Sequence, residues 1–311
     1  MSIAPADLRG VHLVPLTAFD KSDQINETVQ AQHTRNMYDA GVRLYLPAAG
    51  TSEFQSLSLD EVVKLVEITR ANSGPDALIF APVGLQLQHS IEIGRRALEV
   101  GATGIMFMPF VHPYLSDEGA RDYYLQVIQA TQCPTLIYKK RAIPSDALLL
   151  ELSDNEHVVG IKHATNAMHE FRKVIQADGG RTEWICGSAE RFAPYYMLAG
   201  SPGFTTGAGN LCPHLSLACH AAFAAKQWEE GMRLQAIIQP IEDFRARSGD
   251  SYNVSMLKYA MSLTGPDFGP ARAPQRQLTA QDRSQIDALM QPILAAEAEV
   301  KSEAQSVGLS R

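Results

Sequence analysis

The stretch His157-Val-Val-Gly-Ile-Lys-His-Ala-Thr-Asn166 ends an apolar run on a cation, Lys162. Such a run predicts a buried strand that opens into a loop, with the ammonium at the rim of a hydrophobic core. Burial disfavours the charged form of an amine, and a lysine that is partly neutral near pH 7 can form a Schiff base with a carbonyl compound. A surface lysine just beyond a strand end is the alternative.

Eight short apolar runs, including this one, alternate with longer amphipathic segments along the chain. This alternation is typical of β-α units on a parallel sheet. Eight units within roughly 220 residues match a (β/α)8 barrel, whereas a doubly wound sheet would carry a Gly-x-Gly-x-x-Gly turn after its first strand. No such turn follows Leu16, so the sequence predicts an α/β fold with a TIM barrel over residues 1–224. The predicted strands are Val11–Leu16, Val42–Leu46, Leu78–Val83, Gly104–Met108, Thr135–Tyr138, Val158–Lys162, Glu183–Cys186 and Gly203–Thr206.

Helix-start residues and a change in pattern support this division. Asn26, Ser58 and Ser116 are predicted to cap helices at their amino ends. After residue 224 the strand signals stop, and helical segments follow around a Gly/Pro-rich connector over residues 264–274 that cannot be helical. The sequence therefore predicts a C-terminal helical extension over residues 225–311. Its predicted helices are Lys226–Arg247, Asn253–Leu263 and Thr279–Val307.

The composition excludes several classes of partner. Hydrophobic residues make up 45% and charged residues 20% of the 311 residues, as in an ordinary globular enzyme. The formal net charge of −7 comes without a basic cluster, which argues against nucleic acid or an anionic membrane as a partner. No apolar run approaches the roughly 20 residues of a membrane span, and the first residues do not resemble a leader, so a cytoplasmic protein is expected.

The cysteines and histidines give no metal-binding pattern. The four cysteines are scattered without a Cys-x-x-Cys pair, and the nine histidines show no His-x-His or His-Glu-x-x-His motif. We therefore expect reduced thiols in the core and a site without a metal. The cysteines are Cys133, Cys186, Cys212 and Cys219.

Polar residues follow several predicted strands, at the end of a barrel that carries its reactive groups. Gly50, Thr51 and Ser52 combine backbone N–H groups with two hydroxyls, which suits a cradle for a carboxylate; a helix-start loop is the alternative. Tyr138 ends the fifth predicted strand and Lys162 the sixth. Because neighbouring strands lie about 4.8 Å apart, we expect the Tyr138 phenol to approach the Lys162 amine.

The eighth predicted strand runs into Gly203-Phe-Thr-Thr-Gly-Ala-Gly-Asn210. Its glycines allow the backbone to approach a ligand closely, or they only permit tight turns at the end of the barrel. Thr206 on this strand is a further candidate substrate-binding residue.

These landmarks together resemble the pyruvate-dependent class I aldolases and dehydratases typified by dihydrodipicolinate synthase and N-acetylneuraminate lyase. The resemblance implies a lyase in which Lys162 forms an imine with a small 2-oxo acid, without any other cofactor, and Tyr138 moves protons. It also implies that Thr51 and Ser52 hold the substrate carboxylate, and that the chain forms a homotetramer. The matching stretches are Pro15-Leu-Thr17, Gly50-Thr-Ser52, Tyr138, Gly160-Ile-Lys162 and Gly203-Phe-Thr-Thr206.

Two departures from the synthase pattern concern the far end of the substrate. The synthases carry Pro-Tyr-Tyr after strand 4, where this chain has Pro109-Phe-Val-His-Pro-Tyr114. They also have an asparagine after the strand-5 tyrosine, where this chain has Lys139, followed by Lys140 and Arg141. Arg141 or Lys140 is therefore a candidate to bind the tail of a sugar acid, with solvated loop cations as the alternative. The role of Lys139 stays open.

Three longer stretches resemble the 5-dehydro-4-deoxyglucarate dehydratase branch of this family, although Ile161-Lys-His-Ala164 departs from its Phe-Lys-Asp-Gly. The main prediction is a hydro-lyase that dehydrates a keto-deoxy sugar acid. The alternatives are a class I aldolase acting on a pyruvate-derived 2-oxo acid and a catalytically idle binding barrel. The three stretches are Gly50–Leu57, Ser251–Lys258 and Gly269–Pro274.

Overall fold

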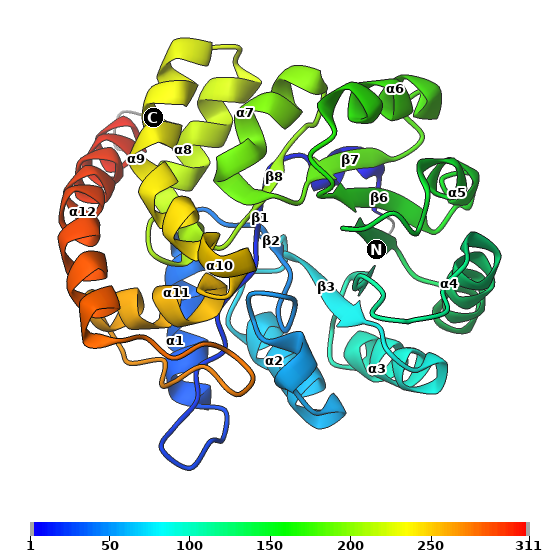
Figure 1. The fold of residues 1–311 in the computed structure, drawn as a ribbon, viewed down its shortest axis with the longest axis horizontal. Coiled ribbons are helices and arrows are strands. Elements are labelled where there is room, and N and C mark those ends of the chain that lie inside the picture. The colour runs from blue at the N-terminus through cyan, green and yellow to red at the C-terminus, as the bar shows by residue number, and fades with distance from the viewer. Residues whose placement is uncertain (1–2, 309–311) are drawn as a thin grey trace.

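Eight parallel strands form a closed barrel in the computed structural model, which describes residues 3–308 (Figure 1). The strands follow chain order, and β1 pairs with β8 to close the sheet. The predicted TIM barrel is confirmed. Strands β1, β2, β4 and β8 are shorter than predicted, and β5 and β6 are each one residue longer. The strands are β1 Val11–Leu13, β2 Leu44–Tyr45, β3 Leu78–Val83, β4 Gly104–Phe107, β5 Thr135–Lys139, β6 Val158–His163, β7 Glu183–Cys186 and β8 Phe204–Thr206.

Helices surround the barrel, and their amino ends carry the predicted caps. The Asn26 and Ser116 side chains accept hydrogen bonds from backbone N–H groups three residues later, and Ser58 forms a capping box with Glu61. The surrounding helices are α1 Glu27–Asp39, α2 Leu59–Ala71, α3 Leu87–Glu99, α4 Asp117–Thr131, α5 Asp146–Leu152, α6 Met168–Asp178, α7 Ala189–Ala199 and α8 Pro213–Ala224, with 3-10 turns η1 Pro5–Leu8, η2 Phe54–Ser56 and η3 Ala208–Asn210.

The C-terminal extension is helical, as predicted. The first predicted helix ends two residues early, because the backbone after it is left-handed at Ser248, Gly249 and Asp250, with φ of 50°, 68° and 65°. Residues 309–311 of the predicted extension and residues 1–2 of the predicted barrel lie outside the described residues. The helices of the extension are α9 Trp228–Arg245, α10 Arg247–Asp250, α11 Asn253–Ser262 and α12 Ala280–Gly308.

The boundary between barrel and extension is not a break in packing. One apolar cluster runs from Leu215 on α8 through Ile238 on α9 and Met256 on α11 to Ile286 on α12. The division at residue 224 therefore stays a prediction based on the change of pattern. None of the described helices is both long and apolar enough to cross a membrane.

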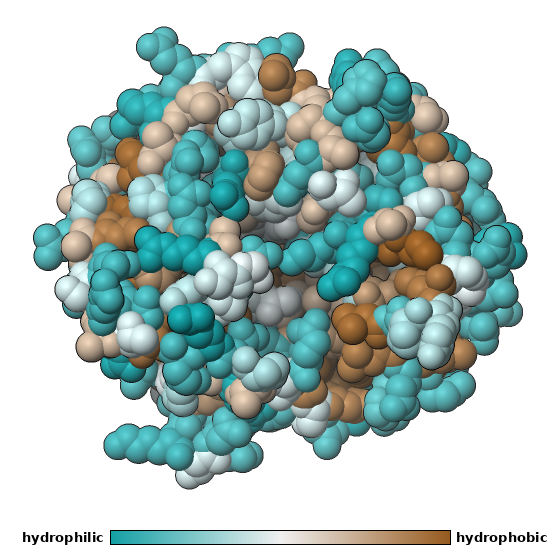
Figure 2. All heavy atoms as spheres, in the orientation of Figure 1, coloured by the Kyte–Doolittle hydropathy of each residue, from teal (hydrophilic) through white to brown (hydrophobic). Residues whose placement is uncertain are grey.

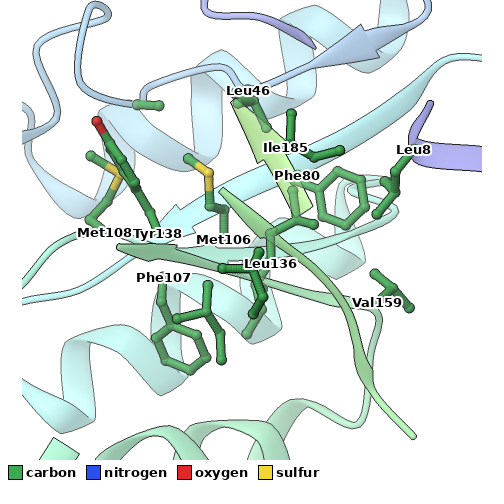
Figure 3. Packing of buried hydrophobic residues seen from close by; sticks show 14 of the residues in the cluster. Leu8, Leu46, Phe80, Met106, Phe107, Met108, Leu136, Tyr138, Val159 and Ile185 are labelled. Carbon is green, nitrogen blue, oxygen red and sulfur yellow. The ribbon is translucent and has the colours of Figure 1, made fainter. Parts of the chain in front are cut away.

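The barrel interior is a packed core that is filled at the amino ends of the strands. Tyr138 and Met108 lie at one end of the cluster in Figure 3, and Leu8 of η1 lies at the other. A Cβ atom on Gly160 of β6 would come within 2.8 Å of the Leu8 side chain, so this end is tightly filled. The open end is therefore the one to which Tyr138 points.

A buried ion pair ties the extension to the loop after β2. The Lys258 ammonium on α11 lies 2.6 Å from the Glu53 carboxylate, and both side chains are almost fully buried. The Arg272 backbone N–H donates to the same carboxylate at 2.7 Å, and Lys258 donates to the Pro270 carbonyl at 3.1 Å. The three stretches that resemble the dehydratase branch thus meet in one network, which fixes the connector between α11 and α12 against the barrel.

Candidate active site at the carboxyl ends of the strands

A cavity of about 380 Å³ opens at the carboxyl ends of the strands, where the extension meets the barrel. Figure 2 looks onto this face, with hydrophilic residues around a central hollow, and α10 lies in front of the barrel in Figure 1. The polar and charged lining residues are Thr51, Gln55, Tyr138, Lys140, Lys162, Asn166, Ser188, Arg191, Thr205, Thr206, Glu242, Arg245, Asp250, Asn253 and Gln275.

Lys162 is a buried lysine that faces this cavity. Only 6% of it is exposed, and its ammonium lies 4.2 Å from the centre of the Tyr138 ring. Burial lowers the pKa of Lys162 to about 7, and the nearby Lys140 and Arg245 cations act in the same direction. Lys162 is therefore not a surface lysine. Near neutral pH, a large fraction of the Lys162 side chains is in the neutral, nucleophilic amine form.

Tyr138 lies directly beside Lys162 because β5 and β6 pair with these two residues in register. Its side chain is buried, and burial raises the pKa of the phenol above its usual range, helped by the Asp250 carboxylate. The phenol therefore stays protonated across the neutral range and is available as a proton donor beside the amine. The predicted approach of Tyr138 to Lys162 is confirmed.

The loop after β2 contributes less of the predicted cradle than expected. Gly50 and Thr51 line the cavity, and the Thr51 hydroxyl lies 3.3 Å from both Arg245 and Asn253. Ser52 is buried outside the described lining, where its hydroxyl donates to the Pro15 carbonyl. The serine thus braces the loop, and its hydroxyl does not face the cavity.

The three cationic residues that follow Tyr138 lie in three different environments. Lys139 is buried, with its ammonium 2.6 Å from the Pro144 carbonyl and 3.1 Å from the Asp146 carboxylate, so it holds the loop that follows β5. Lys140 lines the cavity and lies 3.5 Å from Asp250. Arg141 is exposed, and the described lining of the cavity does not include it. Lys140 is thus the better placed candidate for a substrate tail.

The extension supplies charged residues that the sequence analysis missed. Arg245 on α9 is buried at the cavity wall, where it pairs with Glu242 and donates to the Asn253 side chain at 2.8 Å. Asn253 falls in a stretch that resembles the dehydratase branch, which is a signal for it. Arg245 and Glu242 gave no such signal, because charged residues on an amphipathic helix usually face water.

The end of β8 closes the cavity on the side of Arg245. Thr206 lines the cavity, and its hydroxyl lies 2.5 Å from the buried Glu190 carboxylate. A Cβ atom on Gly207 would lie 2.4 Å from the Arg245 guanidinium. The glycine after Thr206 is therefore needed for the close approach of Arg245, whereas the predicted approach to a ligand stays a prediction.

Free thiols and histidines do not form a second centre. All four cysteines are buried free thiols. Within residues 3–308, His, Cys, Asp and Glu side chains do not gather in a group of three that could hold a metal ion. The chemistry that the described cavity offers is therefore that of an amine, a phenol, carboxylates and cations.

Comparisons with known proteins agree with this arrangement. The model of the dihydrodipicolinate synthetase family matches residues 7–293. A 5-dehydro-4-deoxyglucarate dehydratase of Pseudomonas putida is 26% identical over 91% of this chain and 95% of its own length, and a probable enzyme of that name from Acinetobacter baumannii is 28% identical over 90% and 94%.

Solved structures extend the same comparison. Dihydrodipicolinate synthase from Bacillus clausii is 31% identical and superimposes with a TM-score of 0.89 over 92% of this chain and 98% of its own. The sialic acid aldolase of Ruminococcus gnavus, at 18% identity and a TM-score of 0.87 over 94% and 99%, shares the fold. The chain therefore belongs to the dihydrodipicolinate synthetase family.

Proposed function

We propose that this chain is a hydro-lyase that dehydrates a keto-deoxy sugar acid through an imine at Lys162, as a 5-dehydro-4-deoxyglucarate dehydratase does. The observation that carries the proposal is the Lys162 amine, buried at the base of a polar cavity with its pKa lowered to about 7 and the Tyr138 phenol beside it. An idle binding barrel has no need of such a desolvated amine.

The reaction uses the amine first and the phenol afterwards. The neutral Lys162 amine adds to the ketone of a 2-oxo acid, and the adduct loses water to give a protonated imine. The imine withdraws electrons, so that a proton passes from C3 to a water molecule in the cavity and an enamine forms. The enamine then expels the C4 hydroxyl, which takes a proton, with Tyr138 as the donor, and departs as water. Hydrolysis of the imine returns the free amine.

Other residues that line the cavity bind the two ends of the substrate. Gly50 and Thr51 bind the carboxylate next to the ketone, and Arg245 beside Thr51 adds a cation on that side. Lys140 at the mouth of the cavity binds the far end of the sugar acid. Charge-assisted hydrogen bonds of this kind are the strong ones in a partly buried site.

Dehydration is preferred over aldol cleavage because the curated relatives described above carry the dehydratase name over almost the whole chain. The alternative is a class I aldolase, which forms the same imine and then breaks the C3–C4 bond. In cleavage a base takes the proton of the C4 hydroxyl, whereas in dehydration an acid protonates that hydroxyl as it leaves, so the product distinguishes the two reactions.

Borohydride trapping tests the proposal. The protein is incubated with pyruvate or a keto-deoxy sugar acid and reduced, and peptide mass spectrometry is expected to place the adduct on Lys162. Lys162→Ala should lose the adduct, while Lys173→Ala, which removes an exposed lysine on α6, should keep it. Loss of a sugar acid without release of pyruvate then indicates dehydration. Unmodified Lys162 after reduction would overturn the proposal, and pyruvate release would favour the aldolase.

A homotetramer and a cytoplasmic location belong to the same proposal. Apolar side chains on the neighbouring loops after β3 and β4 are exposed: 61% of Leu85, 74% of Val111 and 89% of Tyr114. Brown residues gather on that side of the face in Figure 2, beyond β3. Exposed apolar groups of this kind favour an interface between copies. Light scattering should give about four times 34.0 kDa, and a lower mass for Val111→Asp.

A further inference from the structure

Glu190 is a fully buried carboxylate that lies behind the cavity wall. It is the second residue of α7, and the left-handed backbone of Ala189, with φ of 56°, precedes it. A left-handed alanine is uncommon and costs about 1 kcal/mol, which the surrounding structure must offset. The turn sends Glu190 into the interior, where one of its oxygens meets Thr206.

The hydrogen bonds around Glu190 are unequal. Its Oε1 atom lies 2.5 Å from the Thr206 hydroxyl and 2.6 Å from the Ser216 hydroxyl, whereas its buried Oε2 atom has no hydrogen-bond partner in the part of the chain that the structure describes. The Gly209 N–H donates to the Thr206 hydroxyl oxygen at 2.7 Å. A threonine hydroxyl has one hydrogen and two lone pairs. If Glu190 is ionised, that hydrogen points at Glu190 and only a lone pair faces the cavity.

A proton on Glu190 reverses this pattern. When the proton is on Oε1 and points at Thr206, the threonine oxygen accepts from both Glu190 and Gly209, while the Ser216 hydroxyl can still donate to Oε1. The hydrogen of Thr206 must turn elsewhere, and the cavity is the side that is open to it. The protonation state of Glu190 thus decides whether Thr206 presents a donor or an acceptor to whatever fills the cavity.

The surroundings of Glu190 favour the protonated form. Burial, followed by repulsion from the Glu242 carboxylate on α9, raises the pKa of Glu190 to about 7, although the Ser216 and Thr206 hydroxyls oppose the shift. Arg245 on α9 pairs directly with Glu242. Within residues 3–308, three buried thiols also face Glu190, and their raised pKa values keep them neutral: Cys186 of β7, Cys212 just before α8 and Cys219 of α8.

We propose that Glu190 is a positioning residue that acts through Thr206, and that its proton turns the Thr206 hydroxyl into a hydrogen-bond donor to a hydroxyl of the substrate. This inference rests on the proposed function, because only a hydroxylated substrate that loses an oxygen benefits from a donor at that place. A donor stabilises the oxygen on which charge develops as the C–O bond breaks. Glu190 keeps its proton throughout and does not transfer it to the substrate.

The pH dependence of kcat tests the proposal. In the wild-type protein kcat for a keto-deoxy sugar acid should fall on the alkaline side of neutral, about tenfold per pH unit once Glu190 is mostly ionised. Glu190→Gln keeps a donor toward Thr206 but does not titrate, so the alkaline fall should disappear. Tyr138 does not produce this fall, since its pKa lies above the usual range. An alkaline fall that persists unchanged in Glu190→Gln would overturn the inference.

Two further variants keep the test informative if Glu190→Gln folds poorly. Ser216→Ala removes a hydroxyl that donates to the Glu190 carboxylate and favours its ionised form, so the alkaline fall should move to higher pH. Thr206→Val should lower kcat and flatten the profile, with no further loss when combined with Glu190→Gln. A shift to lower pH in Ser216→Ala, or multiplying losses in the double variant, would contradict the mechanism.

The control is another largely buried carboxylate outside the cavity. Glu297 on α12 accepts hydrogen bonds from the N–H groups of His214 and Leu215 on α8, and Glu297→Gln should keep the wild-type profile. Borohydride trapping with pyruvate runs in parallel, so that the two proposals fail separately. If the wild-type protein gives no adduct, the imine mechanism is wrong. If every variant gives the adduct but the profiles coincide, only the role of Glu190 is wrong.

Discussion

Replacing Lys258 with methionine should cost this protein several kcal/mol of stability. Lys258 and Glu53 form an ion pair of 2.6 Å, with only 2% and 0% of their side chains exposed. Burial lowers the pKa of Lys258, although the Glu53 carboxylate opposes the shift, so the lysine keeps its charge because of its partner. Methionine fills a similar volume but leaves the Glu53 carboxylate buried without a cation.

Loss of one partner from a buried pair costs about 3–5 kcal/mol, because the remaining charge stays desolvated. The Arg272 N–H still donates to Glu53 in the variant, so we expect the lower half of that range, about 3–4 kcal/mol. For a chain of this size each kcal/mol shifts the melting temperature by about 2 °C, which gives a decrease of about 6–8 °C.

Thermal and urea unfolding at fixed protein concentration measure this loss. The matched control is Arg233→Met, which breaks an exposed pair with Glu230 at 2.7 Å and should cost less than about 1 kcal/mol. Glu53→Gln combined with Lys258→Met removes both charges and should recover most of the stability. The reasoning fails if Lys258→Met unfolds like the control, or if the double variant is less stable than the single one.

Three further predictions concern the cavity. Borohydride trapping of pyruvate by the wild-type protein should speed up as pH rises through about 7, because the neutral amine of Lys162 increases, and stopped samples analysed by mass would show it. Lys140→Ala removes a cation that lowers the pKa of Lys162, so the rise in trapping rate should move to higher pH, and KM for a sugar acid should increase. Arg141→Ala should leave the trapping rate and KM within about twofold of the wild-type values. Gly207→Ala places a Cβ against the Arg245 guanidinium and should lower kcat/KM at least tenfold without loss of the adduct, measured by steady-state kinetics.

Periodicity was sufficient to predict the barrel and the contact between its two central groups. The spacing of neighbouring strands is fixed, so two residues paired in register at the strand ends must lie side by side, as Tyr138 and Lys162 do. The position of a loop residue along the barrel axis is not fixed in this way. Thr51 and Ser52 are adjacent and chemically alike, yet only the threonine faces the cavity, because the Pro15 carbonyl takes the serine hydroxyl.

The missed residues belong to contacts between distant segments. Arg245 approaches the β2 loop across 194 positions of sequence, and Glu190 meets Ser216 across 26. A charged residue on a helix carries no mark in the sequence that tells burial from exposure, since the same amphipathic pattern fits both. Likewise Lys139, Lys140 and Arg141 form one basic run in the sequence. Only the fold shows that Lys139 is buried in the loop after β5, that Lys140 lines the cavity and that Arg141 is exposed to solvent.

The C-terminal extension forms part of the cavity and is not a separate addition to the barrel. The barrel strands supply the amine and the phenol, which are what imine formation requires. The extension supplies Arg245, Glu242 and Asn253, which line the other side of the same cavity and reach the loop after β2. Because Glu242 repels Glu190 and thereby helps to keep it protonated, the extension also influences the polarity of a hydroxyl on β8. In the proposed reaction, imine formation therefore depends on the barrel, whereas the fate of the imine depends on residues that α9 and α11 bring to it.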